Sequence, residues 1–527
     1  MYKRLFNRCI RFSEANWCRI LGIAVFAILP PTVCAQNVAD SVSTIRVNTH
    51  LVLLDACVLD AKGKPVQGLT KQDFEVIEDG QPQKIVSFDT QQARLLPQSS
   101  YRKGVTLDVT QPQQFGRAPV TIFVLDEMNT HFADASFAVR SLRSYLEKQP
   151  GLLPQAAALF TVTNSGFQVL QLYTADRELL LHALNAHKIV YAWKLEQSKS
   201  VGVEVVDRLE ASLSAMEQIA QNAAALPEHK NLVWIGAGFP TLPPDALAPA
   251  MQKLLRNTLQ HVTDELLEAR ISLYVVDPTT TAAGMTEITD ESQLAFTAAA
   301  GDGTSRLSDP FDKSLDFDRL APVSGGRVIR GLNNVDEQID LSVRIAGSYY
   351  TLGYQPKDTT LAEHQYRKIR IVCKHHGTTV LSRDGYYTSP AAALVTGRDI
   401  VQSDLNNAAV AKVPFAALAV QAKGSRGKYV VHVKSSGLSW SPDGEGEKTA
   451  QVQVMAVALS ATNEVRGHRL LSMTAHSSAT RKATSENDDA AFGIEFTTPP
   501  KTKTLRFVVR DSTTGHMGTV DLSPDKN

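Results

Sequence analysis

The stretch that decides the fold is Pro119-Val120-Thr121-Ile122-Phe123-Val124-Leu125-Asp126-Glu127-Met128-Asn129-Thr130. Its apolar part is rich in Val and Ile and lacks polar alternation, which is typical of a strand buried on both faces of a helix-covered parallel sheet. Asp126 would then lie at the carboxyl end of a central strand, where open α/β sheets bind their ligands. The alternative is that Asp126 and Thr130 only cap the following helix, expected over residues 133–148.

The composition indicates a globular protein. The chain has 527 residues, of which 43% are hydrophobic and 20% charged, and its 54 basic residues balance its 54 acidic ones. This length is typical of about three domains. Charges of both signs are interspersed, so the sequence has no basic field for nucleic acid and no acidic tail. We therefore expect no nucleic-acid partner.

The N-terminus has the layout of a secretory signal peptide. Basic residues precede the apolar run Ile20–Leu29, and Val33-Cys34-Ala35 follows it. The run is shorter than the roughly 20 residues that a membrane span needs. We expect a signal peptide over residues 1–35, secretion of the remainder, and no membrane span after cleavage. The alternatives are an uncleaved anchor and a lipid-modified Cys34.

Cleavage would leave two cysteines in the mature chain, Cys57 and Cys373, both in strand-like segments. In an oxidising compartment they could form a disulfide, and two buried, unpaired cysteines are the alternative. The sequence has no C-x-x-C motif and no metal-type cysteine spacing.

The pattern of expected strands and helices divides the chain into regions. Residues 45–90 and 348–388 contain only strands and turns, including an Asp79-Gly80 hairpin signal. Residues 118–347 alternate strands with helices, which favours a mostly parallel, doubly wound sheet with helices on both faces. We expect the two flanking segments to form one β module with the α/β domain inserted. Two separate β edges are the alternative.

The rest of the chain is expected to form another β domain. After a linker expected at residues 391–412, residues 413–527 carry strands spaced by roughly ten residues, which is typical of an immunoglobulin-like β-sandwich. Within the α/β region, the stretch Thr279–Asp316 is rich in small and polar residues, and we expect a mobile insertion there.

Several stretches resemble the von Willebrand factor A-related domain proteins secreted by bacteria, of the acidobacterial type. The matching stretches are Val66–Gly80, Ile85–Phe88, Leu125–Thr130, Tyr349–Pro356 and Arg383–Tyr387, and they cover roughly residues 45–390 in the same order as in the family. The resemblance implies a von Willebrand factor A-like fold for the central α/β domain. It also implies partner binding at the carboxyl edge of the sheet.

The resemblance further implies a metal-ion-dependent adhesion site. In the wider superfamily a D-x-S-x-S loop, a threonine and a second aspartate hold Mg²⁺, a hard cation that prefers oxygen ligands. Asp126 and Thr130 match the first Asp and the last Ser of that loop. Asn129 and Glu127 could add oxygens. Met128 replaces the middle Ser, and a thioether is a poor ligand for Mg²⁺.

Two further parts of that site depart from the family pattern. Gly236-Ala237-Gly238 follows the strand after which the second aspartate is expected, and the threonine loop offers only Ser198 and Ser200. We therefore expect a degenerate adhesion site, with Mg²⁺ held by Asp126 and Thr130 as the metal-binding alternative.

The sequence does not favour an enzyme. It contains no G-x-S-x-G elbow, no H-E-x-x-H motif and no G-x-x-x-x-G-K-[ST] loop. We expect a non-enzymatic, adhesion-type protein that binds an extracytoplasmic protein or surface ligand. The expected ligand-binding residues are Asp126, Asn129, Thr130, Gly236 and Asp277. The alternatives are a structural cell-envelope scaffold with a vestigial site and a hydrolase that uses Asp126 or Glu127 as a base.

Overall fold

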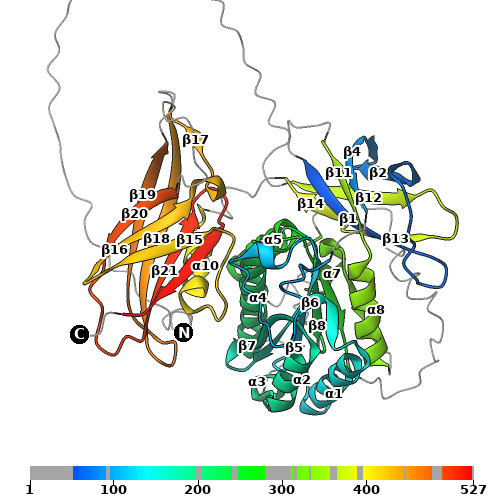
Figure 1. Cartoon of the computed structure of the whole chain (residues 1–527), viewed down its shortest axis with the longest axis horizontal. Coiled ribbons are helices and arrows are strands. Elements are labelled where there is room, and N and C mark those ends of the chain that lie inside the picture. Colours follow the sequence, from blue (N-terminus) through cyan, green and yellow to red (C-terminus); the bar gives the residue numbers. More distant parts are fainter. Residues whose placement is uncertain are drawn as a thin grey trace, which may run out of the picture. The chain divides into compact units, whose positions relative to one another are not determined.

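The computed structural model is a mixed α/β structure with several sheets (Figure 1). It describes residues 51–90, 95–197, 203–239, 247–279, 310–311, 317–330, 334–356, 365–388, 396–443, 447–477 and 489–524. The expected signal peptide and most of the expected mobile insertion lie outside these residues. Among the described helices, none is long and apolar enough to cross a bilayer.

A six-stranded sheet forms the centre of the α/β region, in the order β10-β9-β8-β5-β6-β7. Its strands are β5 (Val120–Asp126), β6 (Leu152–Thr163), β7 (Gly166–Asp176), β8 (Lys230–Ile235), β9 (Ile271–Val276) and β10 (Arg327–Ile329). Neighbouring strands are parallel except β6 and β7, which form an antiparallel hairpin. Every residue of β5 is buried. The strand predicted from the sequence is therefore present, and Asp126 is its last residue.

Helices cover both faces of this sheet. One face carries α4 (Val203–Ala223), α5 (Pro249–Glu268) and α7 (Leu320–Ser324), the last preceded by the 3₁₀ turn η4 (Phe317–Arg319). The other face carries α1 (Phe132–Lys148), α2 (Arg177–Ala186) and α8 (Val335–Gly347). A short helix, α3 (Trp193–Gln197), precedes α4, and the 3₁₀ turn η2 (Pro112–Gln114) precedes β5.

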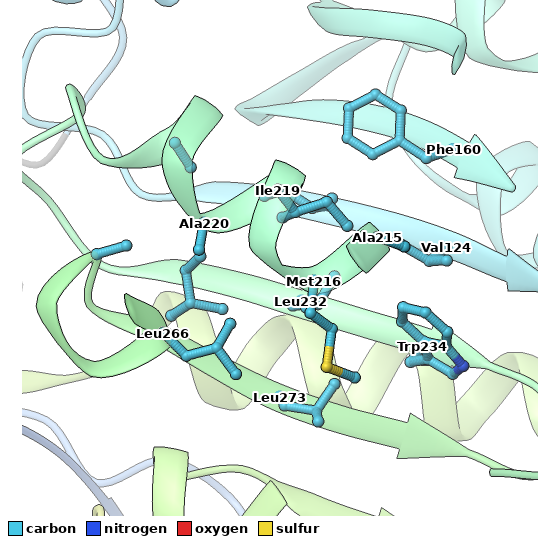
Figure 2. Packing of buried hydrophobic residues seen from close by; sticks show 14 of the residues in the cluster. Val124, Phe160, Ala215, Met216, Ile219, Ala220, Leu232, Trp234, Leu266 and Leu273 are labelled. Carbon is cyan, nitrogen blue, oxygen red and sulfur yellow. The ribbon is translucent and has the colours of Figure 1, made fainter. Parts of the chain in front are cut away.

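The two cores follow from strand geometry, because successive side chains of a strand point to opposite faces. Val124 of β5 packs against the α4 and α5 face, whereas its neighbours Phe123 and Leu125 pack against the α1 and α2 face. Figure 2 shows part of the core on the α4 and α5 face, where Met216 of α4 and Trp234 of β8 belong to the same apolar cluster. Both cores therefore hold the loops at the carboxyl ends of the parallel strands in place.

The first β region contains two four-stranded sheets, in the orders β13-β1-β11-β4 and β14-β12-β2-β3. Its elements are β1 (Val52–Leu59), η1 (Lys71–Asp73), β2 (Phe74–Glu78), β3 (Gln81–Gln83), β4 (Ile85–Asp89), β11 (Tyr350–Tyr354), β12 (Tyr366–Cys373), β13 (Thr379–Leu381) and β14 (Gly385–Tyr387). Strand β1 pairs with β11, and β2 pairs with β12, so each sheet joins strands from before and after the six-stranded sheet. One apolar cluster includes residues of both sheets.

The predicted hairpin at Asp79-Gly80 connects β2 to β3. Both residues have positive φ, 47° and 80°, as the two central residues of a type I′ turn require. The two cysteines of this region, Cys57 and Cys373, are both free and lie in different sheets. Burial raises the pKa of the Cys57 thiol to about 12.

The described residues of the C-terminal region include helix α10 and two sheets, in the orders β15-β16-β20 and β17-β18-β21-β22, with β19 paired to β18. Its elements are α10 (Arg398–Val410), β15 (Val420–Ser425), β16 (Lys428–Lys434), η5 (Ser435–Gly437), β17 (Ser441–Pro442), β18 (Lys448–Leu459), β19 (Val465–Ser477), β20 (Asp489–Glu495), β21 (Thr504–Asp511) and β22 (Met517–Leu522). Residues of both sheets share one apolar core.

The prediction of a linker over residues 391–412 is wrong for most of these residues, because residues 398–410 form α10. This helix buries Leu405 and Ala408 against the C-terminal sheet. It also buries Asp404 and Asn407, which bond to other buried polar groups. These polar residues interrupt the apolar pattern by which a buried helix is recognised in a sequence.

Candidate functional site

Asp126 lies at the carboxyl end of β5 and is 1% exposed. Its Oδ1 accepts hydrogen bonds from the backbone N–H groups of Met128 (3.2 Å) and Asn129 (2.9 Å). Its Oδ2 accepts from Trp234 Nε1 (2.9 Å) and from Asn129 Nδ2 (2.9 Å). The carboxylate thus folds the loop after β5 around itself and connects it to β8.

Asn129 extends this network to helix α4. Its side-chain amide also donates to Ser212 Oγ (3.1 Å), and its Oδ1 accepts from Arg208 Nη1 (2.8 Å). Burial lowers the pKa of Arg208, and the charge of Asp126 opposes that effect. Burial raises the pKa of Asp126, although the hydrogen bonds from Asn129 and Trp234 oppose it. The side-chain amide of Asn129 therefore links the buried carboxylate of Asp126 to the buried guanidinium of Arg208.

The interpretation of Asp126 and Thr130 as helix caps is wrong. The N-cap residue of α1 is His131, which makes no capping side-chain hydrogen bond. Thr130 Oγ1 instead accepts a hydrogen bond from the backbone N–H of Ala237 (3.0 Å). Asp126 therefore bonds to the loop after β5 and to Trp234 of β8, whereas Thr130 bonds to the loop after β8.

Gly236 lies against these two residues, as the strand order requires, because β5 and β8 are neighbours. A Cβ atom at this position would lie 2.6 Å from Asp126 Cβ and 2.8 Å from Thr130 Oγ1. The structure therefore brings together four of the predicted site residues, namely Asp126, Asn129, Thr130 and Gly236.

Asp277 belongs to a separate ion-pair cluster at the end of β9. Its Oδ2 accepts from Arg330 Nε (3.2 Å), and its Oδ1 accepts from the backbone N–H of Thr279 (2.9 Å). Arg330 also pairs with Asp318 at 2.6 Å. The charge of Asp277 is thus compensated locally, and the hydrogen bonds of Asp126 do not include it.

The residues around Asp126 do not fit Mg²⁺. Mg²⁺ needs several oxygen atoms converging in a near-octahedral array, whereas N–H groups of Met128, Asn129 and Trp234 point at Asp126. The Met128 side chain is fully buried in the α4 core. Ser198 and Ser200 lie outside the described residues. Metal binding by Asp126 and Thr130 therefore stays a prediction, and the N–H groups that point at Asp126 do not support it.

Glu127 has a different role, which the sequence did not reveal. Its Oε1 is hydrogen-bonded to His187 Nε2 and accepts from Thr161 Oγ1 (3.1 Å), and its Oε2 accepts from the backbone N–H of Val190 (2.7 Å). Glu127 is 1% exposed. A buried carboxylate after β5 therefore tethers the segment 187–190, which follows α2.

The tethered segment and the start of α1 carry a group of exposed apolar side chains. Their exposed fractions are 49% for Phe132, 39% for Val190, 55% for Tyr191 and 46% for Trp193. We call these four residues the apolar edge. The segment is also held by Asn164 of the β6–β7 turn, whose Nδ2 donates to Tyr191 O (2.7 Å). The backbone at Val190 and Tyr191 is therefore held by hydrogen bonds to Glu127 and Asn164.

An open depression of about 690 Å³ lies against Phe132 of the apolar edge. It is lined by Phe132, Ala133, Ser136, Val139, Arg140, Arg143, His187 and Ile189. Sequence reasoning missed this groove because its last lining residue on α1, Arg143, and its first on the other wall, His187, are 44 positions apart in the chain. The exposed aromatics Tyr191 and Trp193 were the only signal that could have marked it.

No family model matches the chain, and no curated protein matches it either. The solved structures similar to it include the VWA domain of SpRpn10, with 14% identity and a TM-score of 0.19, over 30% of this chain and 74% of that one. They also include the human COPII-coat protein Sec24c, with 12% identity and a TM-score of 0.24. That match covers 60% of this chain and 52% of the other, so the chain spans about half the length of Sec24c.

Proposed function

We propose that this chain is an exported, non-enzymatic protein that binds a protein partner through the carboxyl edge of its six-stranded sheet. The proposal treats residues 118–347 as a doubly wound, von Willebrand factor A-like domain of the bacterial secreted type. It treats residues 413–527 as an immunoglobulin-like sandwich. The strand order, the helices on both faces and the sequence motifs support these assignments.

The observation that carries the proposal is the apolar edge. Large apolar side chains that are exposed together mark interaction surfaces, because leaving them in water costs free energy. Tyr and Trp are also enriched among the residues that contribute most to protein–protein binding. Tyr191 and Trp193 are mounted on backbone that Asn164 and Glu127 hold in place. A fixed aromatic surface loses little conformational entropy when a partner binds.

The adhesion site is, in this proposal, degenerate and structural. Asp126 fixes the loop after β5 through hydrogen bonds from Asn129 and Trp234. Partner binding would then need no metal, and the binding surface would be shifted from Asp126 and Asp277 toward Tyr191 and Trp193.

A quantitative capture experiment tests the proposed function. Wild-type protein, Tyr191→Ser/Trp193→Ser and the control Val430→Ser are immobilised and exposed to an extracytoplasmic fraction of the source cells. Val430 is a matched control because its side chain is 41% exposed on β16, in the C-terminal region. We expect one protein to bind the wild type and the control at least tenfold more than the double variant. The purified partner should bind the wild type directly in calorimetry. Equal capture by all three proteins would refute the proposal.

Calorimetric titration of Mg²⁺, Mn²⁺ and Ca²⁺ tests the metal-independent part. We expect no binding heat for wild type or Asp126→Asn. Saturable binding by the wild type that is lost in Asp126→Asn would show a working metal site and would overturn the structural role of Asp126.

The His187–Glu127 pair favours a hydrolase as a second candidate. An imidazole oriented by a carboxylate is the usual arrangement of a general base, and His187 lines the depression. Hydrolysis of a fluorogenic ester that is lost in His187→Ala, with unfolding unchanged, would support this candidate over simple binding.

A further inference from the structure

We infer that the groove between α1 and the segment after α2 binds an acidic peptide segment of the partner, in which Asp or Glu alternates with large apolar side chains. This inference rests on the proposed function and names the chemistry of the partner. The groove is the open depression of about 690 Å³ against Phe132 of the apolar edge.

The shape of the groove is set by one face of α1. Ser136, Val139, Arg140 and Arg143 recur at helical spacings of three and four, so they lie along one side of the helix. The opposite wall is formed by His187 and Ile189. Grooves between a helix and a neighbouring segment are a recurring way to bind peptides through a few apolar anchors.

The apolar part of the lining consists of Phe132, Ala133, Val139 and Ile189. Val139 is 6% exposed and belongs to the core of the α1 face, so the bottom of the groove is continuous with packed protein. Phe132 stands 49% exposed at the rim. An apolar side chain bound here could contact Phe132, Val139 and Ile189 and would lose part of its contact with water.

The charged part of the lining is basic only. Arg140 and Arg143 are the charged residues of α1 in the groove, with His187 opposite, and none of the residues that line it is acidic. Arg143 is oriented by a hydrogen bond from its Nε to Asn185 Oδ1 (2.9 Å). A guanidinium binds a carboxylate through two parallel hydrogen bonds, so two arginines about one helical turn apart favour acidic side chains.

A peptide fits these observations better than an anionic membrane does. The basic residues lie in a concave groove beside apolar ones, whereas membrane binding relies on a broad basic surface. The chain as a whole has balanced charge, 54 basic and 54 acidic residues. Tyr191 and Trp193 are exposed two and four residues after Ile189, which lines the groove, and would contact the flanking part of a bound peptide.

A phage-displayed library of random dodecapeptides provides the test. The wild-type protein without residues 1–35 is the bait, and the enriched peptides are synthesised and their affinities measured by fluorescence anisotropy. We expect the enriched sequences to combine acidic with aromatic or aliphatic residues. Arg140→Glu/Arg143→Glu should weaken their binding at least tenfold. The control Arg370→Glu, an exposed arginine on β12, should leave the affinity unchanged.

The outcomes separate this inference from the proposed function. Enriched peptides that bind equally to the wild type and Arg140→Glu/Arg143→Glu, but lose binding in Tyr191→Ser/Trp193→Ser, would overturn the acidic-peptide inference and keep the proposed apolar surface. Enriched peptides without acidic residues would overturn it as well. A library that yields no binder at all would overturn the acidic-peptide inference, whereas the proposed function is decided by the capture experiment. Binding of anionic lipid vesicles that Arg140→Glu/Arg143→Glu abolishes, without peptide binding, would replace the peptide by a membrane. Thermal unfolding of each variant shows that the fold is retained.

Discussion

At Gly236, one additional methyl group would disturb the buried carboxylate of Asp126. A Cβ atom there would lie 2.6 Å from Asp126 Cβ, and neither β5 nor β8 can move without breaking the central sheet. We expect Gly236→Ala to lower the free energy of unfolding by about 1–3 kcal/mol, the usual cost of overpacking a core. Urea denaturation followed by circular dichroism measures the change.

Gly151 offers a matched control in the same region. A Cβ atom there meets nothing within 4 Å, and its φ is not positive. Gly151→Ala should be neutral or stabilise the protein by up to about 1 kcal/mol, because alanine restricts the unfolded chain. Equal effects of the two substitutions would mean that the loop after β8 adapts freely to Asp126.

The candidate site was predictable from the sequence only as far as its backbone positions. The apolar run before Asp126 indicated a buried strand end, and strand pairing then places Gly236 beside it. The direction of side chains was not predictable. The indole N–H of Trp234 donates to Asp126, and the side chain of Met128 is buried in the core. Both orientations depend on packing against α4.

At the scale of elements, Glu127 is the tether of the segment that carries the apolar edge. Its Oε2 accepts the Val190 N–H at 2.7 Å, and its Oε1 binds His187. We expect Glu127→Ala to increase the hydrogen-exchange rate of the Val190 amide by at least tenfold, because a local opening then costs less free energy. Hydrogen–deuterium exchange read by mass spectrometry on peptides over residues 187–193 measures this.

The same experiment has an internal reference. Amides of β6 such as that of Phe160 pair within the central sheet and should keep their exchange rates in Glu127→Ala. Uniformly faster exchange would indicate global destabilisation and would contradict a local tether.

Elements were predictable where one residue pattern covers the whole element. The hairpin at Asp79-Gly80 is such a case, because its positive φ angles select those residue types. Helix α10 was not predictable as a helix, since Asp404 and Asn407 are buried only because groups from other elements bond them. The spacing of strand-like stretches in residues 413–527 did not reveal strand β19, because most of its residues are exposed or half-exposed.

At the scale of the whole molecule, a buried charge cluster connects α4 and α5 with α10 and β21. His261 Nε2 lies 3.1 Å from Asp404 Oδ1 and 3.5 Å from Glu265 Oε1. Arg510 pairs with the other oxygen of Asp404 at 2.7 Å. Glu217 is bonded by Asn407 at 2.6 Å. Burial would lower the pKa of His261, but the charges of Asp404 and Glu265 raise it to about 10.

This raised pKa has a defined effect on stability. A histidine whose folded pKa lies above its unfolded value stabilises the folded state at low pH, and the contribution is lost as the pH rises through the folded pKa. We expect the destabilisation by His261→Gln to be fully present below about pH 6.5. It should shrink toward pH 10, the value that His261 has in the folded protein. Urea unfolding of both proteins at a series of pH values gives the difference.

The effect of His261 is taken as the difference between the wild-type and His261→Gln profiles of unfolding free energy against pH. This difference is needed because other groups titrate in the same pH range. Burial lowers the pKa of Lys230 to about 7, so its contribution to stability increases with pH. Burial raises the pKa of Glu265 to about 7 against the opposing charge of His261, so the contribution of Glu265 itself changes in His261→Gln. The control is His182→Gln, which replaces an exposed histidine of α2. A pH-independent cost of His261→Gln would contradict a charged His261.

The insertion of the α/β region into the first β module has a consequence for biosynthesis. Asp89 of β4 lies opposite Thr351 of β11 in the sheet, although roughly 260 residues separate them along the chain. Ribosomes add about 5–20 residues per second, so β11 is made about 13 to 50 s after β1–β4. For that interval the apolar strand β1 has open edges, on which other nascent chains could pair. Yield during production should therefore depend on elongation rate and holdase chaperones more than on the stability of the finished protein.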